Sequence, residues 1–233
     1  MNQEYILPIR HIEQVTHDVK QYRLDKPSNY QFTPGQATEV AINKPGWKEE
    51  RRPFTFTSLN DDPYLEFTIK SYTDHPGVTN QLNTLDINDE LIVHDVWGAI
   101  EYKGPGYFIA GGAGITPFIA ILRQLKKERR TAGNTLFFSN RTEKDIIIQN
   151  ELSEILGQNA IHVITDEPTT RHMRGFINEE FLKKQVQDFN KNFYVCGPPK
   201  MVEAVNNILI KLGAKPEAVG GKGSRRKKTR RSR

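Results

Sequence analysis

Cysteine is almost absent from this sequence, because Cys196 is the only one among 233 residues. A single cysteine excludes an intramolecular disulfide, and it excludes an iron–sulfur cluster held by several thiolates of the chain. Histidine is also sparse, and the six residues of this type show no spacing typical of a metal site. The sequence therefore predicts a protein without a metal centre.

Long apolar runs are missing as well. No stretch approaches the roughly 20 apolar residues that a membrane-spanning helix needs. The first ten residues include Glu4 and Pro8 and have no apolar core of a signal peptide. These absences predict a cytoplasmic protein without a membrane span, which we expect to be a monomer.

The net charge of +5 is concentrated at one end of the chain. Eight Lys or Arg and no acidic residue lie in residues 220–233. Without these eight, 25 basic residues remain against 28 acidic ones, so the body of the protein is slightly negative. The basic composition therefore predicts a disordered tail over 220–233, and it does not predict specific nucleic-acid binding.

The first hundred residues favour β-structure. Six short segments are rich in Val, Ile, Thr, Phe and Tyr and are separated by Gly, Pro, Asn and Asp. They are Tyr5–Gln14, Val19–Leu24, Ala37–Ile42, Pro53–Ser58, Tyr64–Ser71 and Glu90–Val96. With one short helix expected at Val78–Leu85, this pattern predicts a small antiparallel barrel.

The pattern changes after Lys103–Gly106, where strands begin to alternate with amphipathic helices. The expected strands are Tyr107–Ala110, Thr135–Ser139, Ile161–Thr165 and Asn192–Cys196, and the expected helices are Pro117–Glu128, Asp145–Leu156, Asn178–Gln187 and Pro199–Leu212. Such alternation predicts a parallel sheet covered by helices. We therefore expect a barrel domain over 1–103, an α/β domain over 104–219 and the tail over 220–233.

The segment Arg51–Ser58 places an arginine and an aromatic residue on a predicted strand. Arg52 and Phe54 are two residues apart, so an extended chain sends both side chains to one face. That face offers a guanidinium for phosphate and a ring for stacking, and the Thr55 hydroxyl can hydrogen-bond a ring nitrogen. An ordinary strand with a core aromatic and a surface arginine has the same pattern, so both interpretations stay open.

The segment Tyr107–Pro117 joins a predicted buried strand to a helix through a glycine-rich turn. Gly112 and Gly114 allow the backbone to approach a ligand, and a helix N-terminus attracts a diphosphate. Thr116 is expected as N-cap with Pro117 in the first turn. Because Pro117 replaces the third glycine of the dinucleotide fingerprint, the turn fits either nucleotide binding or close packing.

A second strand-to-helix turn spans Phe193–Met201. Parallel strands bind ligands at their carboxyl ends, so Cys196, Gly197 and Pro198 should lie beside the glycine-rich turn. A lone cysteine at a strand end is usually a small core residue. No general base stands next to it in the sequence, so we expect no covalent thiol chemistry.

Five segments together resemble the ferredoxin–NADP reductase superfamily, particularly its compact bacterial flavodoxin-reductase-like members. In chain order they are Phe32–Gln36, Arg52–Thr55, Gly77–Asn80, Gly111–Pro117 and Cys196–Met201. The resemblance covers about residues 5–219. It implies a six-stranded antiparallel FAD-binding barrel followed by an NAD(P)-binding parallel-sheet domain.

On the flavin side, the resemblance implies that Arg52 grips the FAD diphosphate and that Phe54 covers one face of the isoalloxazine. Thr55 resembles the residue that hydrogen-bonds flavin N5. The turn that holds the flavin diphosphate corresponds to Gly77, Val78 and Thr79.

On the nucleotide side, the implied contacts fall into three groups. The loop under the nucleotide corresponds to Gly112, Gly114, Thr116 and Pro117. The strand end beside the nicotinamide corresponds to Cys196, Gly197 and Pro198, with Cys196 and Thr55 closest to the chemistry. The adenosine end corresponds to Asn140, Arg141 and Asp166.

The implied activity is hydride transfer between NAD(P)H and FAD, with electrons passed to a carrier such as flavodoxin or ferredoxin. A flavin-binding sensor, or an electron-transfer subunit of a larger complex without its own turnover, is the alternative. Acceptor surfaces have no linear motif, so the sequence does not name the acceptor.

NADH is the expected nucleotide. The 2′-phosphate of NADPH needs basic partners, and Asp166 and Glu167 follow the third predicted parallel strand where such partners usually stand. Against this, Arg171, His172 and Arg174 lie just downstream and can offset these acids, and Arg141, after the second predicted parallel strand, can serve either nucleotide.

The end of the chain departs from the family pattern. After Lys215–Val219 the sequence becomes glycine-rich and then basic, where relatives continue into another strand. An altered reading frame, a cloning scar or a native tail would each produce this ending.

Overall fold

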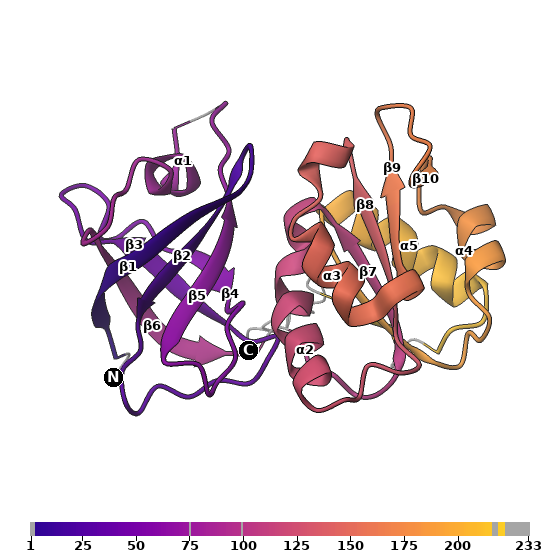
Figure 1. Ribbon diagram of the computed structural model, residues 1–233, viewed down its shortest axis with the longest axis horizontal. Helices are drawn as coiled ribbons and strands as arrows, with labels where there is room; N and C mark the ends of the chain where they lie inside the picture. The colour runs from indigo at the N-terminus through magenta and orange to yellow at the C-terminus, as the bar shows by residue number, and fades with distance from the viewer. Residues whose placement is uncertain (1–2, 75, 99, 216–218, 222–233) are drawn as a thin grey trace, which may run out of the picture.

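The computed structural model describes residues 3–74, 76–98, 100–215 and 219–221. Figure 1 shows a barrel built from the first half of the chain beside a helix-covered sheet built from the second half. This is the antiparallel barrel followed by a parallel α/β domain that the sequence predicts. Within the described residues, no helix is long and apolar enough to cross a membrane.

The barrel has six antiparallel strands in the order β4-β3-β6-β1-β2-β5. They are β1 (Tyr5–Thr16), β2 (Val19–Asp25), β3 (Ala37–Ile42), β4 (Arg52–Thr55), β5 (Tyr64–Lys70) and β6 (Glu90–Trp97), with α1 (Val78–Leu82). The two ends of this order meet where Phe56, just after β4, bridges Phe67 on β5. Both rings are fully buried, so the same contact closes the barrel and fills its core.

The second sheet is parallel, in the order β10-β9-β8-β7-β11-β12. Its strands are β7 (Gly106–Gly111), β8 (Thr135–Asn140), β9 (Ala160–Ile164), β10 (Met173–Arg174), β11 (Asn192–Cys196) and β12 (Val219–Gly221). The helices are α2 (Thr116–Lys127), α3 (Gln149–Leu156), α4 (Glu179–Gln185) and α5 (Pro199–Lys211), and the 3₁₀ turns are η1 (Gly112–Ile115), η2 (Glu143–Asp145) and η3 (Gly157–Asn159).

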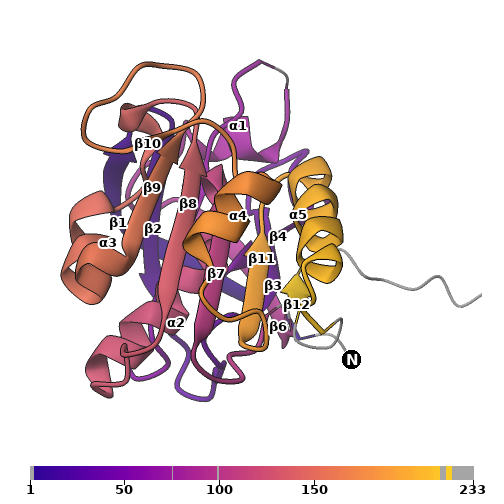
Figure 2. The ribbon, with the colours of Figure 1, turned by 90° about the vertical axis from the view of Figure 1, so that its right-hand side faces the viewer.

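Helices cover both faces of this sheet (Figure 2). Phe108 and Phe138 pack with α2 and α3, whereas Tyr107 and Phe137, the preceding residues, pack with α4 and α5. Successive side chains of a strand point to opposite faces, so a sheet buried on both sides needs continuous apolar strands. That requirement explains the apolar segments seen in the sequence.

The helix expected over Asp145–Leu156 begins four residues later. The side chains of Thr142 and Asp145 form a capping box around the short turn η2. Ile148 then adopts a left-handed conformation with φ 45°, which an α-helix cannot contain. The true helix, α3, therefore starts at Gln149.

The two domains share an apolar contact. Val19, on a barrel strand, is buried in the same cluster as Phe118 and Ile147 of the α/β domain. Gly35 has φ +95°, and a Cβ there would lie 2.1 Å from the main-chain oxygen of Ile100. Only glycine fits this close approach of the barrel to the interdomain segment.

The predicted tail begins too early. Gly220 and Gly221 belong to β12, where they pair with Tyr194 and Val195 of β11, so the correction is that both residues are part of the sheet. The rest of the predicted tail, residues 222–233, lies outside the described residues.

Candidate active site

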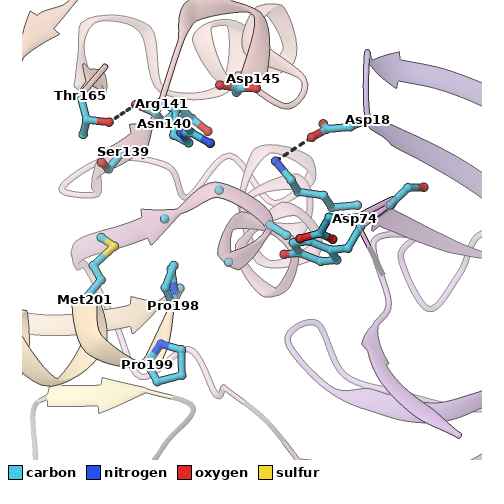
Figure 3. Close-up of a pocket in the computed structure, with 18 of the residues that line it drawn as sticks. Asp18, Asp74, Ser139, Asn140, Arg141, Asp145, Thr165, Pro198, Pro199 and Met201 are labelled. Atoms are coloured by element: carbon cyan, nitrogen blue, oxygen red, sulfur yellow. Dashed lines mark hydrogen bonds and ion pairs between the residues drawn. The ribbon is translucent and has the colours of Figure 1, made fainter. Parts of the chain in front are cut away.

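A cavity of about 940 Å³ lies between the two domains. The barrel contributes the residues at the end of β5, from Lys70 to Asp74, together with Asp18. The α/β domain contributes the carboxyl ends of β7, β8 and β11 with the loops that follow them. Figure 3 shows these side chains converging from both domains. The location matches the rule that open α/β sheets bind ligands beyond the carboxyl ends of their strands.

Two glycine-rich turns form the floor of the cavity. A Cβ on Gly114 would lie 2.3 Å from the main-chain oxygen of Cys196, and one on Gly197 would lie 3.1 Å from the main-chain nitrogen of Gly111. The turns after β7 and β11 therefore touch through bare backbone, as the sequence predicts. Their glycines leave a shallow surface on which a flat ligand can lie.

Thr116 is not the N-cap of α2. The chain already turns as a 3₁₀ helix over Gly112–Ile115, and Thr116 is the first residue of α2. Its hydroxyl donates a hydrogen bond to the main-chain oxygen of Ala113 at 3.1 Å. Pro117 is buried. Gly112 and Gly114 line the cavity, so the 3₁₀ turn and not the start of α2 faces the cavity.

A buried amide marks the far end of the cavity. Asn140, the last residue of β8, is 4% exposed and lines the cavity. Neither its Oδ1 nor its Nδ2 has a hydrogen-bond partner among the described residues. An unsatisfied buried polar group costs about 1–3 kcal/mol, so this amide fits a ligand that hydrogen-bonds to it.

An ion pair lies beside this amide. The Nε of Arg141 donates to Oδ2 of Asp166 at 2.7 Å, and the Thr165 hydroxyl donates to Oδ1 of Asp166 at 2.6 Å. The Thr165 hydroxyl and the Arg141 guanidinium hold the pKa of Asp166 below its ordinary value. Arg141, which lines the cavity, is thus already paired with a carboxylate.

The barrel strand β4 carries the predicted flavin residues Arg52, Phe54 and Thr55, which are not among the residues that line this cavity. Arg52 is half exposed, and its guanidinium donates to the main-chain oxygen of Arg51 at 2.7 Å and to Glu50 at 3.4 Å. The ring of Phe54 is half-buried, 6.4 Å from that of Phe67. Thr55 is 4% exposed. The strand therefore offers a guanidinium that can turn toward a ligand beside a partly open ring.

The turn at Gly77 opens α1 on the barrel. Gly77 has extended backbone and precedes the helix, and Thr79 is half-buried. Val78 is 2% exposed and belongs to the barrel core. Its side chain is therefore inaccessible, and Val78 can contact a cofactor only through its main chain.

The Cys196 side chain is 7% exposed and packs in the apolar cluster beneath α2, with Phe108 and Ile115. Its main-chain oxygen, in contrast, lies against Gly114. The residue thus meets the glycine-rich turn through its backbone, while the thiol belongs to the core.

Several cavity residues were not singled out from the sequence. Lys70, Tyr72 and Asp18 reach the cavity from the barrel, and Ser139 and Met201 reach it from the α/β domain. Lys70 is ion-paired with Asp18 at 2.8 Å. The polar residues at the end of the fifth predicted strand are visible in the sequence. Only the packing of the two domains places them opposite the glycine-rich turns after β7 and β11.

One group of side chains in the described structure has the composition of a cation site. His17, Asp18 and Asp145 bring potential ligand atoms within 4.8 Å of one another, across the domain boundary. Burial raises the pKa of Asp18, but the hydrogen bond from Lys70 and its charge outweigh burial and leave that pKa below its ordinary value. Lys70 already neutralises Asp18, so we assign no metal to this group.

Comparison with known sequences identifies the two domains. Residues 7–102 match the oxidoreductase FAD-binding domain, and residues 108–207 match the oxidoreductase NAD-binding domain. NADH-cytochrome b5 reductase 1 of Coccidioides immitis is 31% identical, over 86% of this chain and 72% of its own. The reductase component of propane 2-monooxygenase from Rhodococcus jostii is 26% identical, over 91% of this chain and 61% of its own.

Solved structures share the fold. A ferredoxin NADP⁺ reductase from Neisseria gonorrhoeae, with bound FAD and NADP, superposes with a TM-score of 0.79 at 19% identity, over 90% of this chain and 92% of its own. The flavohem-like FAD/NAD-binding domain of a Vibrio cholerae nitric oxide dioxygenase gives 0.81 at 20% identity, over 92% and 96%. Together with the matched domains, this fold makes the chain a member of the ferredoxin–NADP reductase superfamily, an FAD- and NAD-binding oxidoreductase.

Proposed function

We propose that this protein is a reductase that takes hydride from NADH and delivers electrons to a small carrier protein. The observation that carries the proposal is the interdomain cavity, with a glycine floor at one end and the unpaired Asn140 amide at the other. Such a cavity suits an extended ligand with a flat ring and a polar far end. We assign the flavin domain to residues 1–103 and the nucleotide domain to residues 104–221.

On the flavin side, FAD supplies the hydride acceptor when bound. Arg52 offers a planar guanidinium to the diphosphate, and the half-open ring of Phe54 covers one face of the flavin. Thr55 is placed on the same strand to hydrogen-bond the flavin ring. Gly77, Val78 and Thr79 complete the diphosphate site, with Val78 acting through its main chain.

On the nucleotide side, the glycine floor orients the nicotinamide. Gly112, Gly114 and Gly197 let the ring approach the barrel without steric hindrance, and Pro198 borders the same surface. Three further residues hold these turns in place without lining the cavity: Thr116, through its hydrogen bond to Ala113, the buried Pro117, and Cys196, through its main chain against Gly114. Asn140 hydrogen-bonds the adenosine end.

The pair formed by Arg141 and Asp166 supports NADH as the preferred nucleotide. Asp166 occupies the guanidinium that a 2′-phosphate would otherwise recruit, and its own charge repels that phosphate. A carboxylate at the adenosine ribose can instead accept hydrogen bonds from free hydroxyls. The cytochrome b5 reductases that resemble this chain carry NADH in their names.

The carrier is a ferredoxin, a flavodoxin or a protein of the cytochrome b5 type. Relatives are named for cytochrome b5 and as reductase components of oxygenase systems, including the ferredoxin–NAD(P)⁺ reductase component of a naphthalene dioxygenase. The competing function is a flavin sensor or a subunit without independent turnover.

Anaerobic titration tests the proposal. NADH should bleach the flavin absorbance of the purified protein, and oxidised ferredoxin, flavodoxin or cytochrome b5, added next, should restore it. Bleaching without reoxidation by any of these carriers would favour the sensor or subunit. Failure of both NADH and NADPH to bleach the flavin would contradict the proposal.

A further inference from the structure

A fully buried carboxylate on the barrel is paired with an arginine of the other domain. Glu66, on β5, is 0% exposed. Its Oε1 accepts hydrogen bonds from Nη1 of Arg123 at 2.7 Å and from the hydroxyl of Thr57 at 2.9 Å, and its Oε2 accepts from Nε of Arg23 at 2.8 Å. A buried charge is tolerated only when it is paired and hydrogen-bonded in this way.

Arg123 uses its whole guanidinium at the domain boundary. Besides Glu66, it donates from Nη1 to the main-chain oxygen of Thr57 at 2.7 Å. Its Nε and Nη2 donate to the two carboxylate oxygens of Glu151, on α3, at 2.6 and 2.8 Å. The planar fork of arginine fixes its orientation when it binds on both edges, so Arg123 joins three elements rigidly.

The two ends of this contact lie close in sequence to the two cofactor sites. Thr57 is two residues beyond Thr55. Arg123 is seven residues beyond Thr116, which places it about 10 Å along α2 from the glycine turn. The contact therefore joins the segment just after β4, which carries the proposed flavin residues and is called the flavin strand below, to α2. This helix follows the glycine-rich turn Gly112–Ile115, called the nucleotide loop below.

We propose that Arg123 is a positioning residue for hydride transfer: its pairing with Glu66 sets the separation between the flavin strand and the nucleotide loop. This inference rests on the flavin and nucleotide sites proposed above. Reacting atoms must approach to about 3–3.5 Å, and an error of about 1 Å costs on the order of 100-fold in rate. The Arg123 contact fixes the domains through directional hydrogen bonds, whereas the docking around Val19 is apolar and has no preferred direction.

The charge state of Glu66 supports this role. Burial raises the pKa of Glu66, but the charge of Arg123 and the hydrogen bonds from Arg123, Arg23 and Thr57 outweigh burial and leave that pKa below its ordinary value. Glu66 is therefore ionised at neutral pH, and the pair keeps its full attraction.

The test compares Arg123→Lys with a double variant, Arg123→Leu with Glu66→Gln, which removes both charges and leaves no unpaired buried carboxylate. The limiting rate of flavin reduction at saturating NADH should fall about 10–100-fold in both. Flavin content and the Kd of NADH should change less than about threefold. The long-wavelength charge-transfer absorbance, which reports stacking of NAD⁺ on the reduced flavin, should weaken.

Lys127→Met is the matched control. Lys127 lies one turn further along α2 and pairs across the same boundary with Asp61, but both side chains are more than half exposed. Its loss should leave the limiting rate and the charge-transfer band unchanged. Wild-type limiting rates in both Arg123 variants, or an equal fall with Lys127→Met, would overturn the inference.

Failure of the underlying site assignment has a separate signature. Phe54→Ala should loosen the flavin and alter its spectrum, since stacking contributes about 0.5–1.5 kcal/mol beyond burial. If Phe54→Ala leaves flavin content and spectrum unchanged, the flavin site is wrong, whatever the Arg123 variants do.

Discussion

We predict that Asp166, the partner of the cavity residue Arg141, sets the preference between NADH and NADPH. Its carboxylate is 2.7 Å from Nε of Arg141, and removing it would free that guanidinium. Asp166→Ser should raise the rate of flavin reduction by NADPH relative to NADH about 10–100-fold, since a charge-assisted hydrogen bond contributes about 1.5–3 kcal/mol. Stopped-flow reduction with each nucleotide at low salt measures the ratio.

Asp166→Glu is the control for this prediction, because it keeps the charge and should keep the preference for NADH. An unchanged ratio in Asp166→Ser would mean that Arg141 does not reach the 2′-phosphate. Arg171, which follows in the next loop, would then be the residue to substitute.

His162 is a second residue whose burial has a measurable consequence. It is 5% exposed on β9, beside His172, and neither ring nitrogen has a hydrogen-bond partner in the described structure. Burial, with a smaller contribution from the charge of His172, lowers the pKa of His162 to about 4, from 6.5. The unfolded chain therefore takes up a proton at a higher pH than the folded protein does.

The free energy of unfolding should consequently fall as the pH drops from 6.5 toward 4, with His162 contributing up to about 1.4 kcal/mol per pH unit. Well above pH 6.5 His162 is neutral in both states and contributes no slope. His162→Gln cannot take up this proton, so urea unfolding between pH 7 and 4.5 should show a shallower slope than wild type. Equal slopes in the two proteins would rule out this role.

At the scale of elements, the close contact between the turns after β7 and β11 shapes the glycine floor of the cavity. Gly114→Ala would place a methyl group 2.3 Å from the oxygen of Cys196, so one of the two turns must move. We expect a loss of about 1–3 kcal/mol in the free energy of unfolding, together with weaker NADH binding. Urea unfolding and nucleotide titration measure these two effects.

Gly112→Ala is the control that distinguishes the effect of a steric clash in this turn from the effect of backbone strain. Gly112 has φ +50°, but no atom lies within 4 Å of a Cβ built there. Alanine at this position should therefore lower the free energy of unfolding only by the cost of its left-handed conformation, about 1 kcal/mol. If Gly112→Ala is as damaging as Gly114→Ala, backbone strain and not the contact with Cys196 limits this turn.

At the scale of the whole molecule, we expect residues 222–233 and the strand β12 to have different roles. The basic residues should affect only binding to polyanions, and β12 should affect stability. A protein ending at Gly221 keeps β12 on the edge of the sheet and loses eight positive charges. We expect it to retain flavin reduction at the full-length rate and to lose salt-sensitive retention on heparin. A protein ending at Lys215 also loses β12, and the unpaired edge of β11 should lower its thermal midpoint.

Equal thermal midpoints for the two truncated proteins would show that β12 contributes nothing to stability. Loss of flavin from the protein ending at Gly221 would show that residues 222–233 are structural.

Local errors of the sequence-based prediction have local physical causes. All ten predicted strands are present because apolar runs report burial directly, whereas the two-residue strand β10 is too short to leave such a run and was not predicted. The start of α3 was missed because the left-handed Ile148 has no sequence signature, and Thr116 was assigned as N-cap because a preceding 3₁₀ turn cannot be seen in the sequence. Gly220 was assigned to the tail because the basic, low-complexity composition of 220–233 predicts disorder, yet β11 provides it with a backbone partner.

The sequence by itself determined the order of the two domains, the apolar strands and the proximity of the two glycine turns, since these follow from periodicity and from the geometry of parallel sheets. Only the tertiary structure decided that Arg123 meets Glu66 and that Arg141 is held by Asp166. These partners are separated by 57 and 25 residues. A charged side chain in a sequence looks the same whether it faces water or a buried partner, so folding alone selects the pair.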